Sequence, residues 1–154
     1  MLTLRNSAKA IIIKDGRLLC TKNISQFDEI YYLLPGGGQE PGETIIETLI
    51  RECREEVGLE VSAPELRYVR DYIGRNHEFK QIHGDVHQIE YMFRCDVKST
   101  AIDTNGKSPD YYQVGIEWVE ISKLAGVRFY PKILLELIGA NGELRGNVYL
   151  GDVN

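Results

Sequence analysis

The side chains best suited to chemistry lie in one short run, Arg51-Glu52-Cys53-Arg54-Glu55-Glu56. If this segment is helical, with about 100° between successive residues, the three glutamates share one stripe along the helix. Carboxylate oxygens are ligands that Mg²⁺ takes from proteins, together with waters and substrate phosphates. The stripe is therefore a candidate metal site. The alternative is a solvated helix face, which is what charge runs usually form.

Two physical effects weigh against a simple solvated face. Like charges three and four residues apart on a helix repel one another by about 0.2–0.5 kcal/mol per pair. The glutamates also lie near the C-terminal end of the predicted helix, where the helix dipole disfavours negative charge. A bound divalent cation would reverse the sign of both effects, so the arrangement favours a metal site.

A glycine-rich segment stands before the acidic stripe. The apolar run from Ile30 to Leu34 predicts a strand, and Pro35-Gly36-Gly37-Gly38 predicts a loop after it, because this run neither continues a ladder nor begins a helix. From Glu43 to Val57 the pattern is helical, and Gly58 stands where a left-handed C-terminal cap is expected. On its own the triple glycine would predict an ordinary turn. Its spacing to the acids favours a functional loop next to them.

The segment from Gly37 to Leu59 resembles the signature of the Nudix hydrolases. That signature is Gly, five residues, Glu, seven residues, then Arg-Glu-apolar-x-Glu-Glu-x-Gly-apolar, and every specified position is filled, with Cys53 at a position more often aliphatic. The order of elements along the rest of the chain also fits this family. The resemblance implies a fold of the α/β (α+β) class, a Nudix-type α/β/α sandwich with a mixed β-sheet, in a single domain over residues 1–154.

The resemblance also implies roles for individual residues. Glu52, Glu55 and Glu56 would bind Mg²⁺ or Mn²⁺ and form the catalytic set together with Arg51, which would orient the acids. Glu43 would be a further ligand, direct or through water. Substrate would lie against two loop residues, Gly37 and Gly38, and the missing side chain of Gly37 would let the loop fold against the helix.

The reaction implied by the resemblance is Mg²⁺-dependent hydrolysis of a pyrophosphate bond in a nucleoside diphosphate linked to another moiety. Metal-activated water would attack one phosphorus, with no covalent enzyme intermediate. Glu55 and Glu56 are the nearest candidates for the general base, and Asp110 and Glu117 are outside candidates. The alternative function is a nucleotide-binding sensor module of the same fold that does not hydrolyse. Such modules tend to lose signature acids, whereas this chain keeps them all.

The substrate class stays open between nucleoside triphosphates, nucleotide sugars and similar compounds. Neither the proline associated with ADP-ribose hydrolases nor the tyrosine associated with diadenosine polyphosphate hydrolases is present after the signature, where Arg75-Asn76-His77 stands. Arg75 and His77 could meet a phosphate or be solvated loop residues. Phe27, Tyr31 and Tyr32 could stack a base or belong to the core.

Further elements are expected on both sides of the signature. A hairpin is predicted from residues 8–14 and 17–22, with Asp15-Gly16 as its turn. Strands are predicted at 66–73, 87–97 and 114–119, and a helix at 131–138. In the second of these strands, Ile89, Tyr91, Phe93 and Cys95 are predicted to face the core. The polar stretch 74–85 is either a mobile loop or part of an extended hairpin.

Composition limits the class of protein and its partners. The 154 residues are 43% apolar and 27% charged, as in folded soluble proteins, and the net charge of −5 argues against a nucleic-acid polymer as partner. Three widely spaced cysteines, Cys20, Cys53 and Cys95, predict buried thiols in a reducing compartment. No signal peptide or membrane span is recognised, so we expect a cytoplasmic protein with no membrane partner. The resemblance implies a small-molecule nucleotide as its substrate. A homodimer remains possible, since members of the family often form one.

Overall fold

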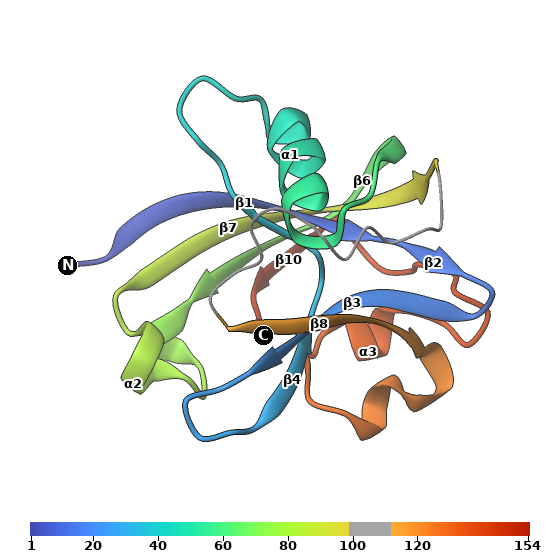
Figure 1. The fold of residues 1–154 in the computed structure, drawn as a ribbon. Helices are drawn as coiled ribbons and strands as arrows, with labels where there is room; N and C mark the ends of the chain where they lie inside the picture. The colour runs from blue at the N-terminus through green and yellow to red at the C-terminus, as the bar shows by residue number, and fades with distance from the viewer. Residues whose placement is uncertain (99–111) are drawn as a thin grey trace.

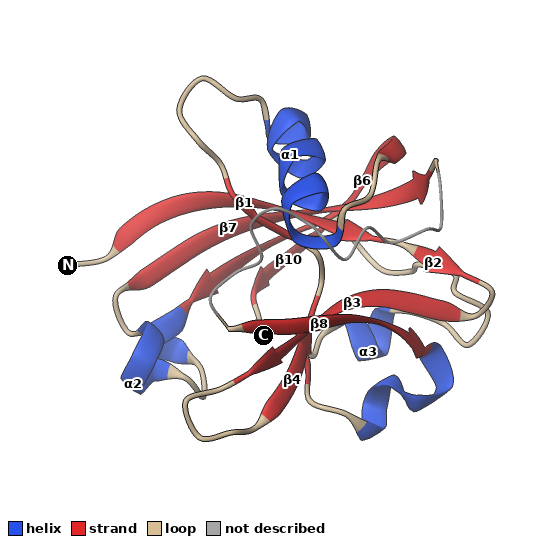
Figure 2. Cartoon of the chain, in the orientation of Figure 1, coloured by secondary structure: helices blue, strands red, loops and turns tan. Residues whose placement is uncertain are grey.

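The computed structural model describes residues 1–98 and 112–154, and in it the strands form two mixed sheets (Figure 1, Figure 2). The first sheet has the order β10-β6-β7-β1-β5, and the second has the order β2-β3-β4-β9 with β8 also paired to β3. The mixed α+β class predicted from the sequence is confirmed. The strands are β1 (Thr3–Ile11), β2 (Ile13–Lys14), β3 (Arg17–Ile24), β4 (Ile30–Leu33), β5 (Gly36–Gly38), β6 (Val61–Ile73), β7 (Val86–Val97), β8 (Gln113–Glu120), β9 (Phe129–Tyr130) and β10 (Tyr149–Asp152).

The helical segments lie outside the two sheets. The longest, α1, follows β5 and lies on the outer side of β1, whereas α3 lies on the far side of the strands in Figure 1. None of the helices among the described residues is long and apolar enough to cross a membrane. The helical segments are α1 (Ile45–Val57), η1 (Gly74–Asn76), α2 (Lys80–His83), η2 (Ile121–Gly126) and α3 (Leu134–Leu137).

The N-terminal hairpin is confirmed only for its second half. The strands β2 and β3 pair antiparallel around Asp15 and Gly16, whose φ angles of 51° and 72° suit a two-residue hairpin turn. The predicted strand over residues 8–14 was wrong in continuity, because it breaks at Ile12. Up to Ile11 the chain pairs with β7 in the first sheet. From Ile13 it pairs with β3 in the second sheet, so the chain crosses from one sheet to the other at Ile12.

The prediction of a loop at residues 35–38 was wrong for Gly36 to Gly38, which form β5. This strand pairs antiparallel with β1, with Gly38 opposite Ser7 and Gly36 opposite Lys9. Gly36 has a φ of 140°, and a Cβ at this position would lie 2.0 Å from the carbonyl oxygen of Ala8. The glycines weaken a strand by themselves, but here their missing side chains allow the backbones to approach closely.

The signature helix is confirmed, although it begins at Ile45 rather than at Glu43. Thr44 is its N-cap and forms a capping box with Glu47, while Gly58, with a φ of 64°, is the left-handed cap at the other end. Leu49, Cys53 and Val57 are fully buried between α1 and the strands beneath it. Burial of each such side chain stabilises the fold by roughly 1.5–3 kcal/mol, so α1 is firmly held against β1.

The second core lies between the two sheets. Ile11, Tyr68 and Met92 of the first sheet meet Leu18 and Cys20 of the second. The helix predicted over residues 131–138 covers this core but is only four residues long, Leu134–Leu137. Its first turn is tighter than an α-helix, because the backbone amide of Leu134 donates to Pro131, and it ends where Ile138 bridges to Leu144.

The long hairpin β6–β7 differs from expectation on its inner face. Ile89 and Tyr91 are only half-buried, whereas Gln88, Glu90 and Met92 are buried on the opposite side of β7. The predicted core face is confirmed for Phe93 and Cys95, which are buried beneath α1, but the opposite face of β7 is buried as well. The first sheet is covered on both faces, by α1 on one and by the second sheet on the other, and the buried side chains of Gln88 and Glu90 are hydrogen-bonded.

The stretch between β6 and β7 is neither a plain loop nor part of the strands, because it holds η1 and α2. The strand β10 lies beyond the last element that the sequence predicts. It adds a parallel strand to the edge of β6, with Tyr149 opposite Val69 and Asp152 opposite Asp71.

Candidate functional site

Four carboxylates gather where α1 meets β5, and we call Glu43, Glu52, Glu55 and Glu56 the acidic cluster. The backbone amide of Gly36 donates to Oε2 of Glu56 at 2.9 Å, and Glu56 is buried. A Cβ on Gly37 would lie 2.5 Å from the carboxylate of Glu52. The glycine strand can therefore lie directly against the acids only because it lacks side chains.

Arg51 binds three members of the acidic cluster. Its Nη1 donates to Glu52 Oε1 at 2.8 Å and to Glu55 Oε2 at 3.2 Å, and its Nε and Nη2 donate to the carboxylate of Glu43. Nη2 also donates to the carbonyl oxygen of Gly38 at 3.0 Å. One guanidinium thus relieves the repulsion between the carboxylates and ties them to the glycine strand.

The acids differ in how readily they ionise. The hydrogen bond from Arg51 lowers the pKa of Glu43 to about 2, against the opposing effect of burial. Burial raises the pKa of Glu52, although its contact with Arg51 acts in the opposite direction. Glu43 is therefore firmly anionic, and Glu52 is an acid that would gain from a further cation near its carboxylate.

The acidic cluster offers a hard donor set. Within the described parts of the chain, no three His, Cys, Asp or Glu side chains converge closely enough to surround a metal ion. Arg51 and the amide of Gly36 hold the carboxylates instead. The donors are nevertheless all carboxylate oxygens, with no thiolate or imidazole in the cluster, and this chemistry fits Mg²⁺ or Mn²⁺.

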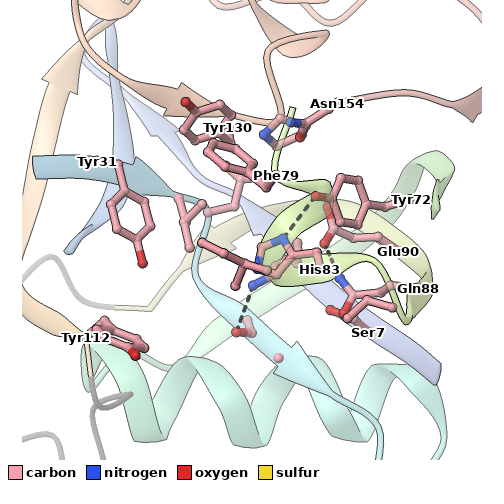
Figure 3. A pocket seen from close by; sticks show the side chains of 18 of the residues that line it. Ser7, Tyr31, Tyr72, Phe79, His83, Gln88, Glu90, Tyr112, Tyr130 and Asn154 are labelled. Carbon is pink, nitrogen blue, oxygen red and sulfur yellow. Dashed lines mark hydrogen bonds between the residues drawn. The ribbon is translucent and has the colours of Figure 1, made fainter. Parts of the chain in front are cut away.

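A cavity of about 630 Å³ is lined by residues of both sheets, and Gly36, Gly37, Gly38 and, from the acidic cluster, Glu52 are among them. Its size suits a small organic ligand. Figure 3 shows Ser7, Gln88 and Glu90 together on one side and Tyr31 across the opening. The polar residues that line it on the first sheet, which we call the pocket floor, are Arg5, Ser7, Lys9, Arg70, Gln88 and Glu90. The rings that line it are those of Phe27, Tyr31, Tyr72, Phe79, His83, Tyr112 and Tyr130.

The pocket floor contains a buried ion pair. Glu90 Oε1 accepts from Arg70 Nε at 3.0 Å, and Oε2 accepts from Gln88 Nε2 at 2.8 Å. Burial opposes ionisation of Glu90, but the charges of Arg70 and Lys9 together with these hydrogen bonds hold its pKa below the usual range. The floor therefore presents a carboxylate that stays charged although it is buried.

Ser7 is the neighbour of Glu90 on β1, because the two residues are opposite one another in the parallel register of β1 and β7. Its side chain is buried, yet Ser7 Oγ has no hydrogen-bond partner among the described residues. An unsatisfied buried polar group costs roughly 1–3 kcal/mol. Such an atom on the wall of a cavity requires an explanation beyond packing.

Lys9 lies between the acidic cluster and the rest of the pocket floor. Its Nζ donates to the carbonyl oxygen of Gly36 at 3.1 Å, and its charge lowers the pKa of both Glu52 and Glu90. A cation at this junction is placed to meet an anionic group that reaches from the pocket toward the acids.

The structure places Arg51 in contact with three acids of the signature and Glu56 against Gly36, but it separates the candidates for base stacking. Phe27 and Tyr31 line the pocket, whereas Tyr32 belongs to the core between the sheets. Successive residues of β4 point to opposite faces, which explains this division. The pocket floor itself was missed by the sequence analysis. Its signal was the pair Gln88 and Glu90, which are polar residues within a strand that is otherwise buried on that face.

Three further candidates from the sequence, the phosphate-binding candidates Arg75 and His77 and the general-base candidate Glu117, do not line the pocket. His77 does not line it and contacts Asp152 instead, with 2.6 Å between Nε2 and Oδ1. Arg75 and Glu117 do not line it either, and Glu117 is exposed on β8 opposite Cys20. Asp110 lies outside the described residues.

Comparison with known proteins gives one family and many related folds. The family model of the NUDIX domain matches residues 3–137. Over 57 residues the chain is 39% identical to CTP pyrophosphohydrolase from Escherichia coli strain K12, a match that covers 36% of this chain and 42% of that protein. The chain thus matches less than half the length of this relative.

Solved structures similar to the chain extend over most of its length. A NUDIX hydrolase from Nitrosomonas europaea has a TM-score of 0.71 and 20% identity, covering 87% of this chain and 85% of its own. A MutT protein from Bacillus halodurans has a TM-score of 0.68 and 19% identity, covering 91% of this chain and 85% of its own. At these identities the similarity is evidence for the fold.

Proposed function

The chain belongs to the NUDIX domain family, and from this premise we propose that it hydrolyses a pyrophosphate bond of a nucleoside diphosphate derivative. One observation carries the proposal. Glu52 of the acidic cluster lines the same 630 Å³ cavity as the aromatic rings of Tyr31, Phe79 and Tyr130. A ligand with a planar base and a chain of phosphates matches this combination, because rings stack bases and acids bind the metal that accompanies phosphates.

The acidic cluster is the proposed metal site. Glu52, Glu55 and Glu56 would hold Mg²⁺ or Mn²⁺, with Glu43 as a further ligand, direct or through water. The bound ion would neutralise phosphate charge and make a bound water more acidic. Arg51 would keep the carboxylates in place, and it already binds Glu43, Glu52 and Glu55.

The proton of the attacking water is assigned to Glu55. The side chain of Glu55 is 40% exposed, so solvent reaches its carboxylate, whereas Glu56 is 5% exposed and accepts from the amide of Gly36. Of these two nearest acids, Glu55 therefore has the better access to water. A general base must lie within hydrogen-bond reach of the proton that it removes.

One cation on the pocket floor, Lys9, would hold the phosphates in place. Its Nζ donates to the carbonyl oxygen of Gly36 at the border of the acidic cluster. Positive charge there offsets the repulsion that phosphates would meet from Glu52 and Glu90. The ligand would thus be oriented with its phosphates toward α1 and its base toward the rings.

We propose nucleoside triphosphates as the substrates. The partial relative is named for CTP, and the matched segment covers 42% of that protein. The test is a screen of nucleoside triphosphates, nucleotide sugars, dinucleoside polyphosphates and ADP-ribose with Mg²⁺, followed by phosphate release after phosphatase treatment. Hydrolysis of triphosphates that stops in excess EDTA and in Glu55→Gln supports the proposal. No turnover with any of these compounds, together with nucleotide binding, would favour a sensor module instead.

A further inference from the structure

Along β1, β7 and β6 the inward-facing side chains change from apolar to polar toward the pocket. Tyr68 on β6 and Met92 on β7 are opposite one another and belong to the core between the sheets. The next row toward the pocket has Ser7, Glu90 and Arg70 side by side on β1, β7 and β6. A buried ion pair is often no more stabilising than apolar residues of similar volume. Stability of the fold therefore does not explain why this row is polar.

The donors around the row are almost all engaged. Arg70 Nε and Gln88 Nε2 donate to different oxygens of Glu90, and Arg70 Nη1 donates to the carbonyl oxygen of Val153 at 2.7 Å. Gln88 Oε1 accepts from Arg5 Nε at 2.7 Å. A carboxylate has about four lone-pair sites, so each oxygen of Glu90 can accept a further hydrogen bond. Ser7 Oγ beside it has no partner anywhere in the described chain.

Aromatic rings line the cavity around this row, and one of them, Tyr72, lies on the floor sheet itself, opposite Gln88. The rings of Phe79 and Tyr130 are packed edge to face with 5.1 Å between their centroids, and Tyr72 OH lies 3.0 Å from His83 Nδ1. Figure 3 shows these rings around the same opening as Ser7 and Glu90. Aromatic side chains bind bases by stacking with little regard to sequence, so the polar row is the part of the pocket that can distinguish one base from another.

From this geometry we propose that Ser7 and Glu90 select nucleobases that carry an exocyclic amino group, namely cytosine, adenine and guanine, over uracil and hypoxanthine. The inference rests on the proposed function, which brings a nucleotide into this pocket. An amino group donates to the carboxylate of Glu90. The neighbouring ring nitrogen of cytosine or adenine accepts from the hydroxyl of Ser7, whereas that of guanine donates a second bond to Glu90.

A base with a carbonyl in place of the amino group is disfavoured by the same atoms. A carboxylate only accepts hydrogen bonds, so a carbonyl oxygen facing Glu90 would put two acceptors together in a buried place. Uracil and hypoxanthine keep one ring N–H that can donate to Glu90, but they lack the amino donor. A carbonyl oxygen then lies against the carboxylate in its place, so one favourable contact is lost and a lone pair is desolvated without compensation. Discrimination would therefore come from repulsion of the wrong base as well as attraction of the right one.

The test measures binding rather than hydrolysis. Calorimetric titrations in EDTA compare CMP with UMP and AMP with IMP, two pairs that differ by an amino group replaced by a carbonyl. We expect the amino-bearing member of each pair to bind at least about tenfold more tightly. Equal affinities, a preference for UMP or IMP, or no binding of any monophosphate would overturn the inference.

Two variants and a control assign the preference to these residues. Ser7→Ala should reduce the ratio of CMP to UMP affinity by about threefold or more, whereas Ser62→Ala, a strand serine outside the pocket, should leave it unchanged. Glu90→Gln can donate as well as accept, so its ratio should fall to about one or invert. If Glu90→Gln does not fold, as judged by circular dichroism, Ser7→Ala decides alone. An unchanged ratio in Ser7→Ala contradicts the inference.

Failure of this inference differs from failure of the proposed function. Equal kcat/KM values for CTP and UTP hydrolysis would keep the hydrolase and overturn the base selection. An amino-group preference in monophosphate binding, with no hydrolysis of any triphosphate, would support the base selection and overturn the hydrolase.

Discussion

The backbone amide of Gly36 donates a 2.9 Å hydrogen bond to Oε2 of Glu56, and this contact joins the glycine strand to the last turns of α1. It connects two parts of the signature that are twenty residues apart in the chain. One of the predicted metal-binding carboxylates is therefore oriented by backbone as well as by α1 itself. The other acids are held by Arg51, so the cluster is arranged before any ligand arrives.

Replacement of Glu56 should separate activity from stability. Glu56→Gln keeps an oxygen that can accept from the Gly36 amide but removes the negative charge. We expect kcat/KM for the best triphosphate to fall by about 100-fold or more, with a melting temperature within a few degrees of the original protein. Glu65→Gln, at an exposed position on β6, is the control and should keep full activity. Full activity in Glu56→Gln would exclude this carboxylate from the reaction.

Two neighbouring glycines should respond differently to alanine. In Gly37→Ala the new Cβ would lie 2.5 Å from the Glu52 carboxylate, whereas in Gly38→Ala it would meet nothing within 4 Å. The carboxylate is the far end of a flexible side chain, so it can move at small cost to stability. We expect Gly37→Ala to lose at least about tenfold in kcat/KM with a nearly unchanged melting temperature.

Gly38→Ala serves as the matched control for that experiment, because it makes the same chemical change one residue away. Its Cβ would meet open space rather than the Glu52 carboxylate, so it should lose clearly less kcat/KM than Gly37→Ala. Equal activity in the two variants would mean that the position of the Glu52 side chain does not matter for turnover.

The sequence predicted that Glu52, Glu55 and Glu56 share one helix, because the signature spacing and the C-terminal Gly58 place all three within it. It failed for β5, because the pairing of Gly36 with Lys9 depends on a distant strand and not on strand propensity. The helix of residues 131–138 was overestimated for a similar reason, since the bridge from Ile138 to Leu144 ends it. Local patterns could not foresee these distant contacts.

The pocket floor could not be predicted from the sequence for a different reason. Alternation along β7 was interpreted as one buried and one exposed face, but a second sheet covers the other face and buries Gln88 and Glu90. Their partner Arg70 lies on β6, and Ser7 lies on β1. The parallel pairing of β1 with β7 brings these residues into one row. A local sequence pattern does not predict the register between strands so far apart in the chain.

Magnesium should stabilise the folded protein through the acidic cluster. A ligand that binds only the folded state at about 100 times its Kd contributes about 2.7 kcal/mol, which for a chain of this size raises the melting temperature by about 5–10 °C. Thermal denaturation with increasing MgCl₂ measures this shift. It should be reversed by EDTA and strongly reduced in Glu52→Gln, and it should persist in Glu65→Gln. A shift of the same size in Glu52→Gln would place the ion elsewhere.

Acid should weaken the attachment of β10 through Asp71. Asp71 Oδ2 accepts from the hydroxyl of Tyr149 at 2.6 Å, and Oδ1 lies 2.7 Å from His87 Nε2. The hydrogen bond from Tyr149, followed by that from His87, lowers the pKa of Asp71 below its ordinary value of 3.8. The unfolded chain therefore takes up this proton at a higher pH than the folded protein does. The stabilisation is complete above the unfolded pKa and is lost as the pH falls through the lower folded pKa.

Asp71→Asn tests this pH dependence. At about pH 5 the original protein should be more stable than the variant by about 1 kcal/mol, or a few degrees in melting temperature. The difference should shrink as the pH is lowered below about 4, because the original protein alone loses the ionised carboxylate. Asp96→Asn, at an exposed position on β7, should show no such convergence. A difference between the original and Asp71→Asn that stays constant or widens down to about pH 2.5 would contradict the stabilising role of ionised Asp71.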